Sequence, residues 1–106
     1  MIKSYIFHLC TKQSWQDQLN IEHYKHESLD SENFIHCCHE EQIAGVINRY
    51  FSGINDLLLL KIESQKVTPK MISELAPIGE YFPHIYGPIN KDAIIEVQEL
   101  DKSRWT

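Results

Sequence analysis

The segment LLLLKI, residues 57–62, contains five aliphatic side chains and one lysine, and it has the length of a single β-strand. An apolar run of this kind, without polar alternation, is typical of a strand that is buried on both faces in the middle of a sheet. Residues 57–62 therefore predict the central strand of the fold, and we assign the other elements around it.

Three further segments predict strands that flank this one. Residues 4–10, SYIFHLC, are rich in β-branched and aromatic types. Alternation divides their side chains into two faces, with Tyr5, Phe7 and Leu9 on one and Ile6, His8 and Cys10 on the other. Residues 34–37 form a short apolar piece at which we expect a strand to end. Residues 92–100, DAIIEVQEL, alternate as a last strand does.

Helical spacing predicts two helices between these strands. Thr11 is suited to cap a short helix over about residues 12–19. The clearest helix repeats apolar residues three and four positions apart, at Ile43, Val46, Ile47, Tyr50 and Phe51. Residues 20–33 are polar and irregular. Residues 64–81 are expected to form a loop, with a short turn of helix or strand around residues 71–75.

This order of elements predicts a small α+β domain with a mixed β-sheet and two or three helices. The sequence contains no linker, repeat or low-complexity tract, so we treat residues 1–106 as a single domain. A chain of 106 residues with 42% hydrophobic residues is long enough to bury one core.

The charge balance restricts the classes of partner. Ten Lys and Arg against fifteen Asp and Glu give a net charge of −5, which argues against a general nucleic-acid binder. Arg49 and Arg104 are the only arginines, so an arginine clamp for phosphates is hard to build. No apolar run has the length of a membrane-spanning helix or a signal peptide, and three cysteines make a poor disulfide framework. We therefore expect a cytoplasmic protein with reduced thiols.

Six histidines are many for a chain of this length. His8, His36 and His84 lie in apolar segments at or near strand ends, where binding sites are often built. The other three lie in polar stretches, and we expect them to be solvated: His23, His26 and His39. Because each buried imidazole needs hydrogen-bond partners, three in apolar segments favour a function over simple filling of the core.

Neither a metal site nor a reactive cysteine is the favoured use of these residues. The chain has no Cys-x-x-Cys or His-Glu-x-x-His spacing, so no metal site is predicted. A thiol at Cys37 or Cys38, before the clearest helix, could have a lowered pKa. However, the spacing of Cys38 and Glu41 copies a capping box, which favours a structural role.

Binding of a small molecule is the third use and the one we favour. Histidine can hydrogen-bond sugar hydroxyls, and a carboxylate can stabilise a developing cation. Tyr86 follows His84 by two residues in an extended stretch, so the two share a face and the phenol ring could stack on a planar ligand. Glu74 and Glu80 precede them and are the candidate carboxylates.

Four segments together resemble the domain-of-unknown-function family 952 over about residues 4–100. They are YIFHLCTKQSW, NFIHCCHEEQIAGVINRYFSG, DLLLLKIE and ELAPIGEYFPHIYGPI, of which the last is the most specific. The family pattern in the second segment is Gly-Phe-Ile-His-Cys/Leu-Ser. In this chain Asn33 replaces the glycine and Cys38 replaces the serine.

This resemblance implies a fold similar to the ADP-ribosyltransferase catalytic domain, a split, mixed sheet whose cleft binds NAD. In that fold a first-strand histidine or arginine contacts the nicotinamide ribose, and His8 matches it by position and type. His36 matches the second segment loosely. The glutamate of the third motif is missing, and Glu74 is the nearest candidate. A related branch, the RNA 2′-phosphotransferases, uses arginines to hold phosphates, and the acidic balance of this chain argues against an RNA substrate.

The leading hypothesis is therefore a site for a nucleotide-like or NAD-like small molecule, with ADP-ribosyl or glycosyl transfer as its chemistry. His8, His36 and Glu74 would be catalytic, His84 and Tyr86 would bind the substrate, and NAD would be a substrate, with no resident cofactor predicted. The alternative is a non-enzymatic module that senses a ligand or contacts a protein, which the missing glutamate favours. A structural role for the histidines predicts that they do not converge on one concave surface.

Overall fold

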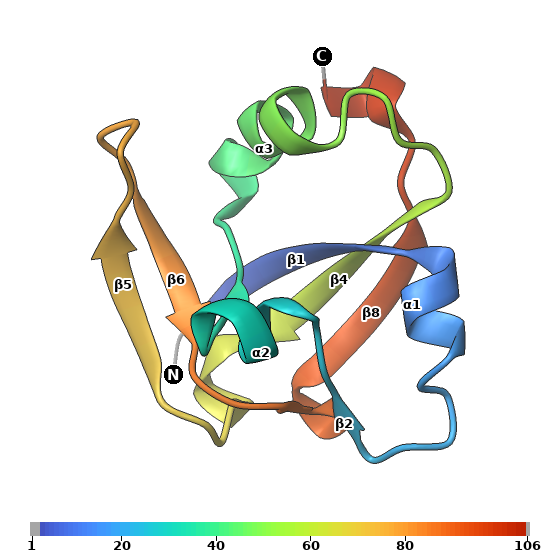
Figure 1. The fold of residues 1–106 in the computed structure, drawn as a ribbon, viewed down its shortest axis with the longest axis vertical. Coiled ribbons are helices and arrows are strands. Elements are labelled where there is room, and N and C mark those ends of the chain that lie inside the picture. Colours follow the sequence, from blue (N-terminus) through green and yellow to red (C-terminus); the bar gives the residue numbers. More distant parts are fainter. Residues whose placement is uncertain (1–2, 106) are drawn as a thin grey trace.

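The computed structural model describes residues 3–105 and is built on a three-stranded antiparallel sheet. Its strands are β1 (Tyr5–Thr11), β4 (Leu57–Glu63) and β8 (Ile94–Glu99), in the order β1-β4-β8 (Figure 1). The prediction that residues 57–62 form the central strand is confirmed. Leu57 to Leu60 are buried without interruption because both faces of β4 are covered.

A second three-stranded sheet stands beside the first. It contains β3 (Ile35–His36), β6 (Tyr81–Ile85) and β5 (Met71–Leu75), in the order β3-β6-β5. A third, short pair joins β2 (His23–Tyr24) to β7 (Ile89–Asn90). The expectation of a mixed sheet is wrong, because every strand pair in residues 3–105 is antiparallel. Alternation predicts which face a side chain occupies, but it carries no information on strand direction.

The residues that follow β3 connect the two larger sheets. Cys37 donates its backbone N–H to the carbonyl of Pro83 in β6, at 3.0 Å. Phe7 of β1 and Cys38 exchange two backbone hydrogen bonds, of 2.8 and 2.7 Å. This short segment therefore lies between β1 and β6, and it brings His36 close to both sheets.

Three α-helices, α1 (Lys12–Gln16), α2 (Ser28–Glu32) and α3 (Ile43–Tyr50), accompany the strands. The Thr11 hydroxyl accepts the N–H of Ser14, which confirms the predicted cap, although the helix ends three residues earlier than expected. Helix α2 lies in the segment described above as irregular. Four 3₁₀ turns complete the chain: η1 (Glu40–Gln42), η2 (Ser64–Lys66), η3 (Lys91–Ala93) and η4 (Lys102–Trp105).

The core consists of two apolar clusters on opposite faces of β1 and β4. Ile6 and Cys10 belong to one cluster, and Phe7 and Leu9 to the other, so the predicted alternation of β1 is confirmed. Helix α3 covers the second cluster with Ile43 and Ile47, which are both buried. Within residues 3–105, no helix is both long and apolar enough to cross a membrane.

Candidate functional site

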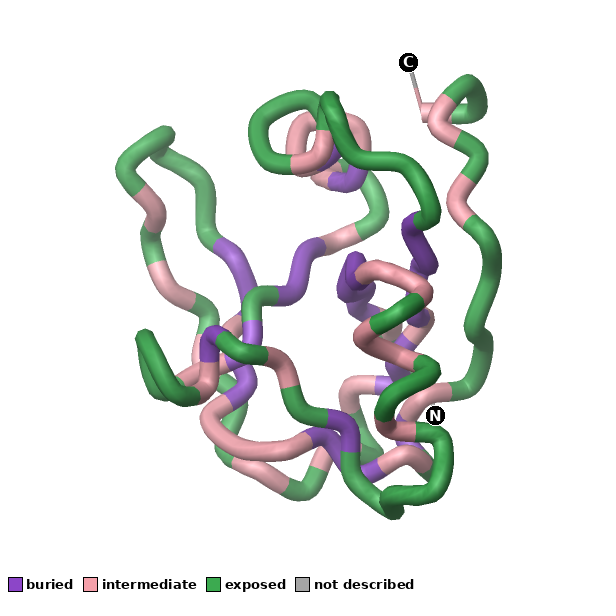
Figure 2. Tube along the Cα trace, turned by 45° about the vertical axis from the view of Figure 1, so that its right-hand side comes forward, coloured by how far each residue is buried: buried purple, intermediate pink, exposed green. Residues whose placement is uncertain are grey.

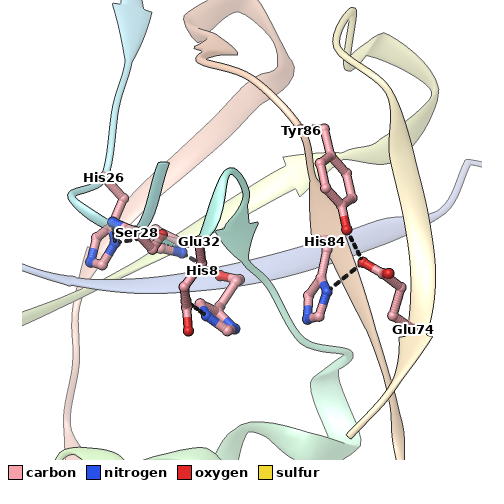
Figure 3. Close-up of polar contacts among 8 residues, drawn as sticks. His8, His26, Ser28, Glu32, Glu74, His84 and Tyr86 are labelled. Carbon is pink, nitrogen blue, oxygen red and sulfur yellow. Dashed lines mark hydrogen bonds and ion pairs between the residues drawn. The ribbon is translucent and has the colours of Figure 1, made fainter. Parts of the chain in front are cut away.

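Glu74, His84 and Tyr86 form a hydrogen-bonded group on one face of the second sheet (Figure 3). Oε1 of Glu74 is 2.8 Å from Nδ1 of His84, and it also accepts the hydroxyl proton of Tyr86 in a short hydrogen bond. The sequence placed Glu74 in a loop. The structure places it on β5, where Ile72 pairs with His84 and Glu74 pairs with Phe82. The register of β5 with β6 therefore places the carboxylate of Glu74 next to the imidazole of His84.

These contacts fix the chemical state of the group. The pKa of Glu74 is lowered, mainly by the hydrogen bond from Tyr86 and next by that from His84. The hydrogen bond to Glu74 in turn raises the pKa of Tyr86. Because an ionised carboxylate only accepts hydrogen bonds, Nδ1 of His84 carries the proton of the neutral ring. In that tautomer, Nε2 is the nitrogen that can accept a hydrogen bond or a proton.

His36 lies next to His84 because β3 pairs with β6 at this position. The two ring centroids are 5.1 Å apart, and the ring of His36 is exposed. Nε2 of His36 forms a short contact with the carboxylate of Glu32, at the end of α2. Phe34 stacks on the ring of His84 with a centroid distance of 4.0 Å and an interplanar angle of 12°. The ring of Phe34 also lies edge-to-face with that of His36, with a centroid distance of 4.8 Å, so two carboxylate–imidazole pairs lie side by side with one aromatic ring against both.

His8 lies behind this face, buried in the interior with 3% of its surface exposed. Its Nδ1 is 2.6 Å from the carbonyl oxygen of His36, and its Nε2 is 2.9 Å from the hydroxyl of Tyr24. Since the carbonyl can only accept, Nδ1 is the donor and Nε2 accepts the Tyr24 proton. Burial lowers the pKa of His8 to about 3, with the neighbouring His26 acting in the same direction. The ring contacts the backbone of His36, not its side chain.

The imidazoles therefore gather in one region, but they do not all line one hollow. His36, His84 and Tyr86 share one face of the second sheet, where His36 is exposed and His84 and Tyr86 are half-buried, and His8 lies behind them in the interior. Two hollows in the described surface lie elsewhere, one over Phe7 and Trp105 and the other beside Asp56 and Lys102. None of the five predicted site residues lines either hollow.

The remaining predicted carboxylate and histidines have other places. Glu80 lies in the β5–β6 turn, where its carboxylate accepts a hydrogen bond from Gln42. His23 is exposed, as expected. His39 caps η1 in a capping box with Gln42, so the box predicted for Cys38 and Glu41 is displaced by one residue.

The sequence analysis did not identify Tyr24, Glu32 and Phe34 as residues of this region, and its expectation that His26 is solvated is wrong. His26 is half-buried, and its ring lies 5.2 Å from that of His8. Desolvation lowers its pKa, and its Nδ1 accepts the backbone N–H of Ser28. A signal for Phe34 was available, since it alternates with His36 in an extended segment and therefore shares its face. Glu32 and His26 gave none, because they lie in the polar segment 20–33.

The thiols of the described cysteines are held in the unreactive, protonated form by burial. The three cysteines are free and buried. Burial raises the pKa of Cys10 to about 11 and that of Cys38 to about 12, and it also raises the pKa of Cys37. Such thiols are poor nucleophiles because the thiolate is the reactive form. Among residues 3–105, no three or more His, Cys, Asp or Glu side chains are grouped to hold a metal ion.

Solved structures of one bacterial protein have the same fold. The chain superposes on the crystal structure of protein CC0527 from Caulobacter crescentus with a TM-score of 0.84 and 22% sequence identity, covering 92% of this chain and 87% of the other. A double mutant of that protein gives a TM-score of 0.83. Its solution NMR structure gives 0.78, at the same identity and with 84% of that chain covered. At this identity the likeness establishes the fold alone.

The sequence itself matches a family of uncharacterised proteins. None of the curated proteins matches it. The match to the family described as "Protein of unknown function (DUF952)" extends over residues 9–97, which includes β4, β6 and every residue of the site except His8. The chain therefore belongs to the DUF952 family.

Proposed function

We propose that this DUF952 chain binds a small, nucleotide-like molecule on the face formed by His36, Glu74, His84 and Tyr86. The observation that carries the proposal is the sharing of Glu74 Oε1 by Nδ1 of His84 and the hydroxyl of Tyr86. A carboxylate that binds one nitrogen of an imidazole, and leaves its second nitrogen without a hydrogen-bond partner among the described residues, is the arrangement of a general base.

The neighbouring pair, His36 and Glu32, supports acid–base chemistry on the same face. Donation from Nε2 of His36 to Glu32 leaves Nδ1 free, next to the ring of His84. A free imidazole nitrogen can take the proton from an acceptor hydroxyl or amine as that group attacks the anomeric carbon, while the bond to nicotinamide breaks and nicotinamide departs as a neutral molecule.

The roles predicted from the resemblance are revised within this proposal. Glu74 supplies negative charge close to a developing cation, as the missing glutamate of the third motif would. His8 becomes a positioning residue, because both of its nitrogens are occupied by the protein. In this proposal NAD is the substrate, and the fold is similar to that of the ADP-ribosyltransferase catalytic domain.

Calorimetric titration with NAD, ADP-ribose and AMP tests the binding. We expect the wild type to bind at least one of them, and His84→Ala to weaken that binding about tenfold or more through loss of a charge-assisted contact. The matched control is His23→Ala, because His23 is exposed and lies outside this face. Absence of binding by the wild type, or equal binding by the two variants, would overturn the proposal.

Turnover distinguishes the enzyme from its alternative. Nicotinamide release from NAD, followed by chromatography, is expected in the wild type and lost in His84→Ala. Binding without release overturns the transferase activity and favours a ligand-sensing module at the same residues.

A further inference from the structure

Strand β5 forms the outer edge of the second sheet. In the order β3-β6-β5 it pairs with β6 on one side, and no described strand pairs with it on the other. Figure 1 shows β5 at the margin of the molecule, with no helix over its outer edge. An uncovered edge strand presents unpaired backbone groups to any strand that can align with it.

The hydrogen bonds at the two ends of β5 show which residues face outward. The carbonyl of Lys70 accepts the N–H of Tyr86, at 2.7 Å, and the N–H of Ala76 donates to the carbonyl of Glu80, at 2.8 Å. Backbone groups of alternate residues point to opposite sides of a strand in an antiparallel ladder. The even-numbered residues of β5 therefore bond to β6, and Met71, Ser73 and Leu75 direct their N–H and C=O groups to the free edge.

The side chains of this edge form an uncovered apolar stripe. Met71, Leu75 and Tyr81 are 39%, 61% and 58% exposed. By register, Met71 pairs with Ile85 and Leu75 pairs with Tyr81, so all three continue the face on which Ile85 is fully buried. Figure 2 shows that burial gives way to exposure along the β5–β6 hairpin. The face of the sheet that packs against the core therefore continues past the core, and there its apolar side chains are exposed.

The first sheet also has an edge strand, β8, but β8 has features that hinder pairing with another strand, and β5 lacks them. Its register with β4 shifts between Lys61 and Ile62, and it carries Glu96 and Glu99. Irregularities and like charges are the common means of preventing edge-to-edge pairing. Strand β5 has five residues in unbroken register, and Glu74 is its only charged side chain.

We propose that β5 pairs with β5 of a second copy of this chain, antiparallel and with the two-fold axis at Ser73. In that register Met71 lies opposite the partner's Leu75, so the apolar stripe covers itself. All outward-facing backbone groups of both strands find partners. Lys70 lies diagonally across from the partner's Glu74, so opposite charges meet at both ends of the interface.

This pairing joins two three-stranded sheets into one and places both candidate sites on the same face. Each Glu74 then lies opposite the partner's Ile72 and beside the partner's Lys70, at the margin of its own site. The dimer does not depend on the proposed ligand, so the two proposals can fail separately.

Sedimentation equilibrium of the unliganded protein, at physiological ionic strength, tests the dimer. We expect the average mass to rise from that of one chain, 12.5 kDa, toward that of two chains as the concentration increases from micromolar to millimolar. Ser73→Pro removes only an outward N–H, and Leu75→Lys places charge in the apolar stripe; both are expected to lose self-association. Circular dichroism and thermal unfolding establish that each variant is folded.

Val97→Lys is the matched control, because Val97 is 41% exposed on the protected edge strand β8, and it is expected to associate as the wild type does. A wild type that keeps the mass of one chain up to millimolar concentration overturns the proposal. So does association that persists in folded Leu75→Lys, or that is lost in Val97→Lys alone, since the interface would then lie elsewhere.

Discussion

The ring of His8 has a protein partner at each nitrogen, the carbonyl of His36 and the hydroxyl of Tyr24. The rings of His36 and His84 each have one partner, a carboxylate, and one free nitrogen. The residue type is the same in the three places, but only His36 and His84 keep a nitrogen for the ligand of the proposed site.

Acid is expected to destabilise the fold through His8. Its folded pKa is about 3 and its ordinary value is 6.5, so the unfolded chain binds the additional proton between these values. Stability is therefore complete above pH 6.5 and falls as the pH is lowered, by about 2 kcal/mol at pH 5. Urea unfolding at a series of pH values measures this loss.

His8→Gln lacks the titrating group and should lose most of this dependence between pH 6.5 and pH 5, at the cost of lower stability at neutral pH. His23→Gln is the control and should keep the dependence, because His23 is exposed. A wild-type stability that is flat over this range would show that His8 is not held neutral by burial.

Tyr86→Phe tests the shared carboxylate. The Tyr86 hydroxyl is the main cause of the lowered pKa of Glu74, so its removal should raise that pKa toward the ordinary value of a glutamate. Carbon-13 NMR titration of the Glu74 carboxyl group measures the shift directly. Tyr81 is on β6, and its side chain lies on the opposite face of the sheet, so Tyr81→Phe should leave the pKa of Glu74 unchanged. An equal effect of both variants would contradict the assignment.

At the scale of elements, the sequence predicted those strands and helices whose apolar pattern is strong. The apolar run at 57–62 predicted β4 as a strand buried on both faces. The alternation at 4–10 predicted β1 and the division of its side chains between two faces. Helix α2 was missed because SLDSE contains a single apolar residue, so it has no periodicity. Strand β6 was missed because it contains Pro83, which argues against an internal strand.

Helix α2 ends at Asn33, which has a φ of 73°. This left-handed conformation favours glycine, and asparagine tolerates it. Asn33→Ala should lower the free energy of unfolding by about 1 kcal/mol, while Asn33→Gly should leave it nearly unchanged. Thermal unfolding followed by circular dichroism compares the two.

Asn33→Ala should also affect the candidate site, because α2 positions Glu32 next to His36. A frayed α2 in Asn33→Ala should broaden the imidazole NMR signals of His36 and leave those of His84 sharp. Equal stability of the alanine and glycine variants would show that the helix end does not depend on this conformation.

The molecule as a whole brings the site together through strand pairing between distant segments. His36 and His84 meet because β3 pairs with β6, and His8 reaches His36 because the segment after β3 bridges to β1. Sequence patterns identified these residues as unusual but could not supply the pairing. The sequence patterns therefore predicted that the histidines lie close together, but not that His8 is buried behind the face that His36 and His84 share.

The same bridge couples the two halves of the core. Cys37 packs in one apolar cluster, and Cys38, its neighbour in the chain, packs in the other. Strands β1 and β4 also contribute side chains to both clusters, so the two clusters should unfold together, as small domains usually do. Cys10 lies in the first cluster, so the three thiols report on both.

Thiol labelling during urea unfolding tests this coupling. In the native protein we expect all three cysteines to be unreactive toward a chromogenic disulfide reagent, because they are buried and their pKa values are raised. They should become reactive in one transition that coincides with the loss of circular dichroism. Ser52→Cys adds an exposed thiol that reacts without urea and calibrates the reagent. If Cys38 reacted at a lower urea concentration than Cys37, the cluster under α3 would open by itself, and the bridge between the sheets would be a hinge instead of a rigid joint.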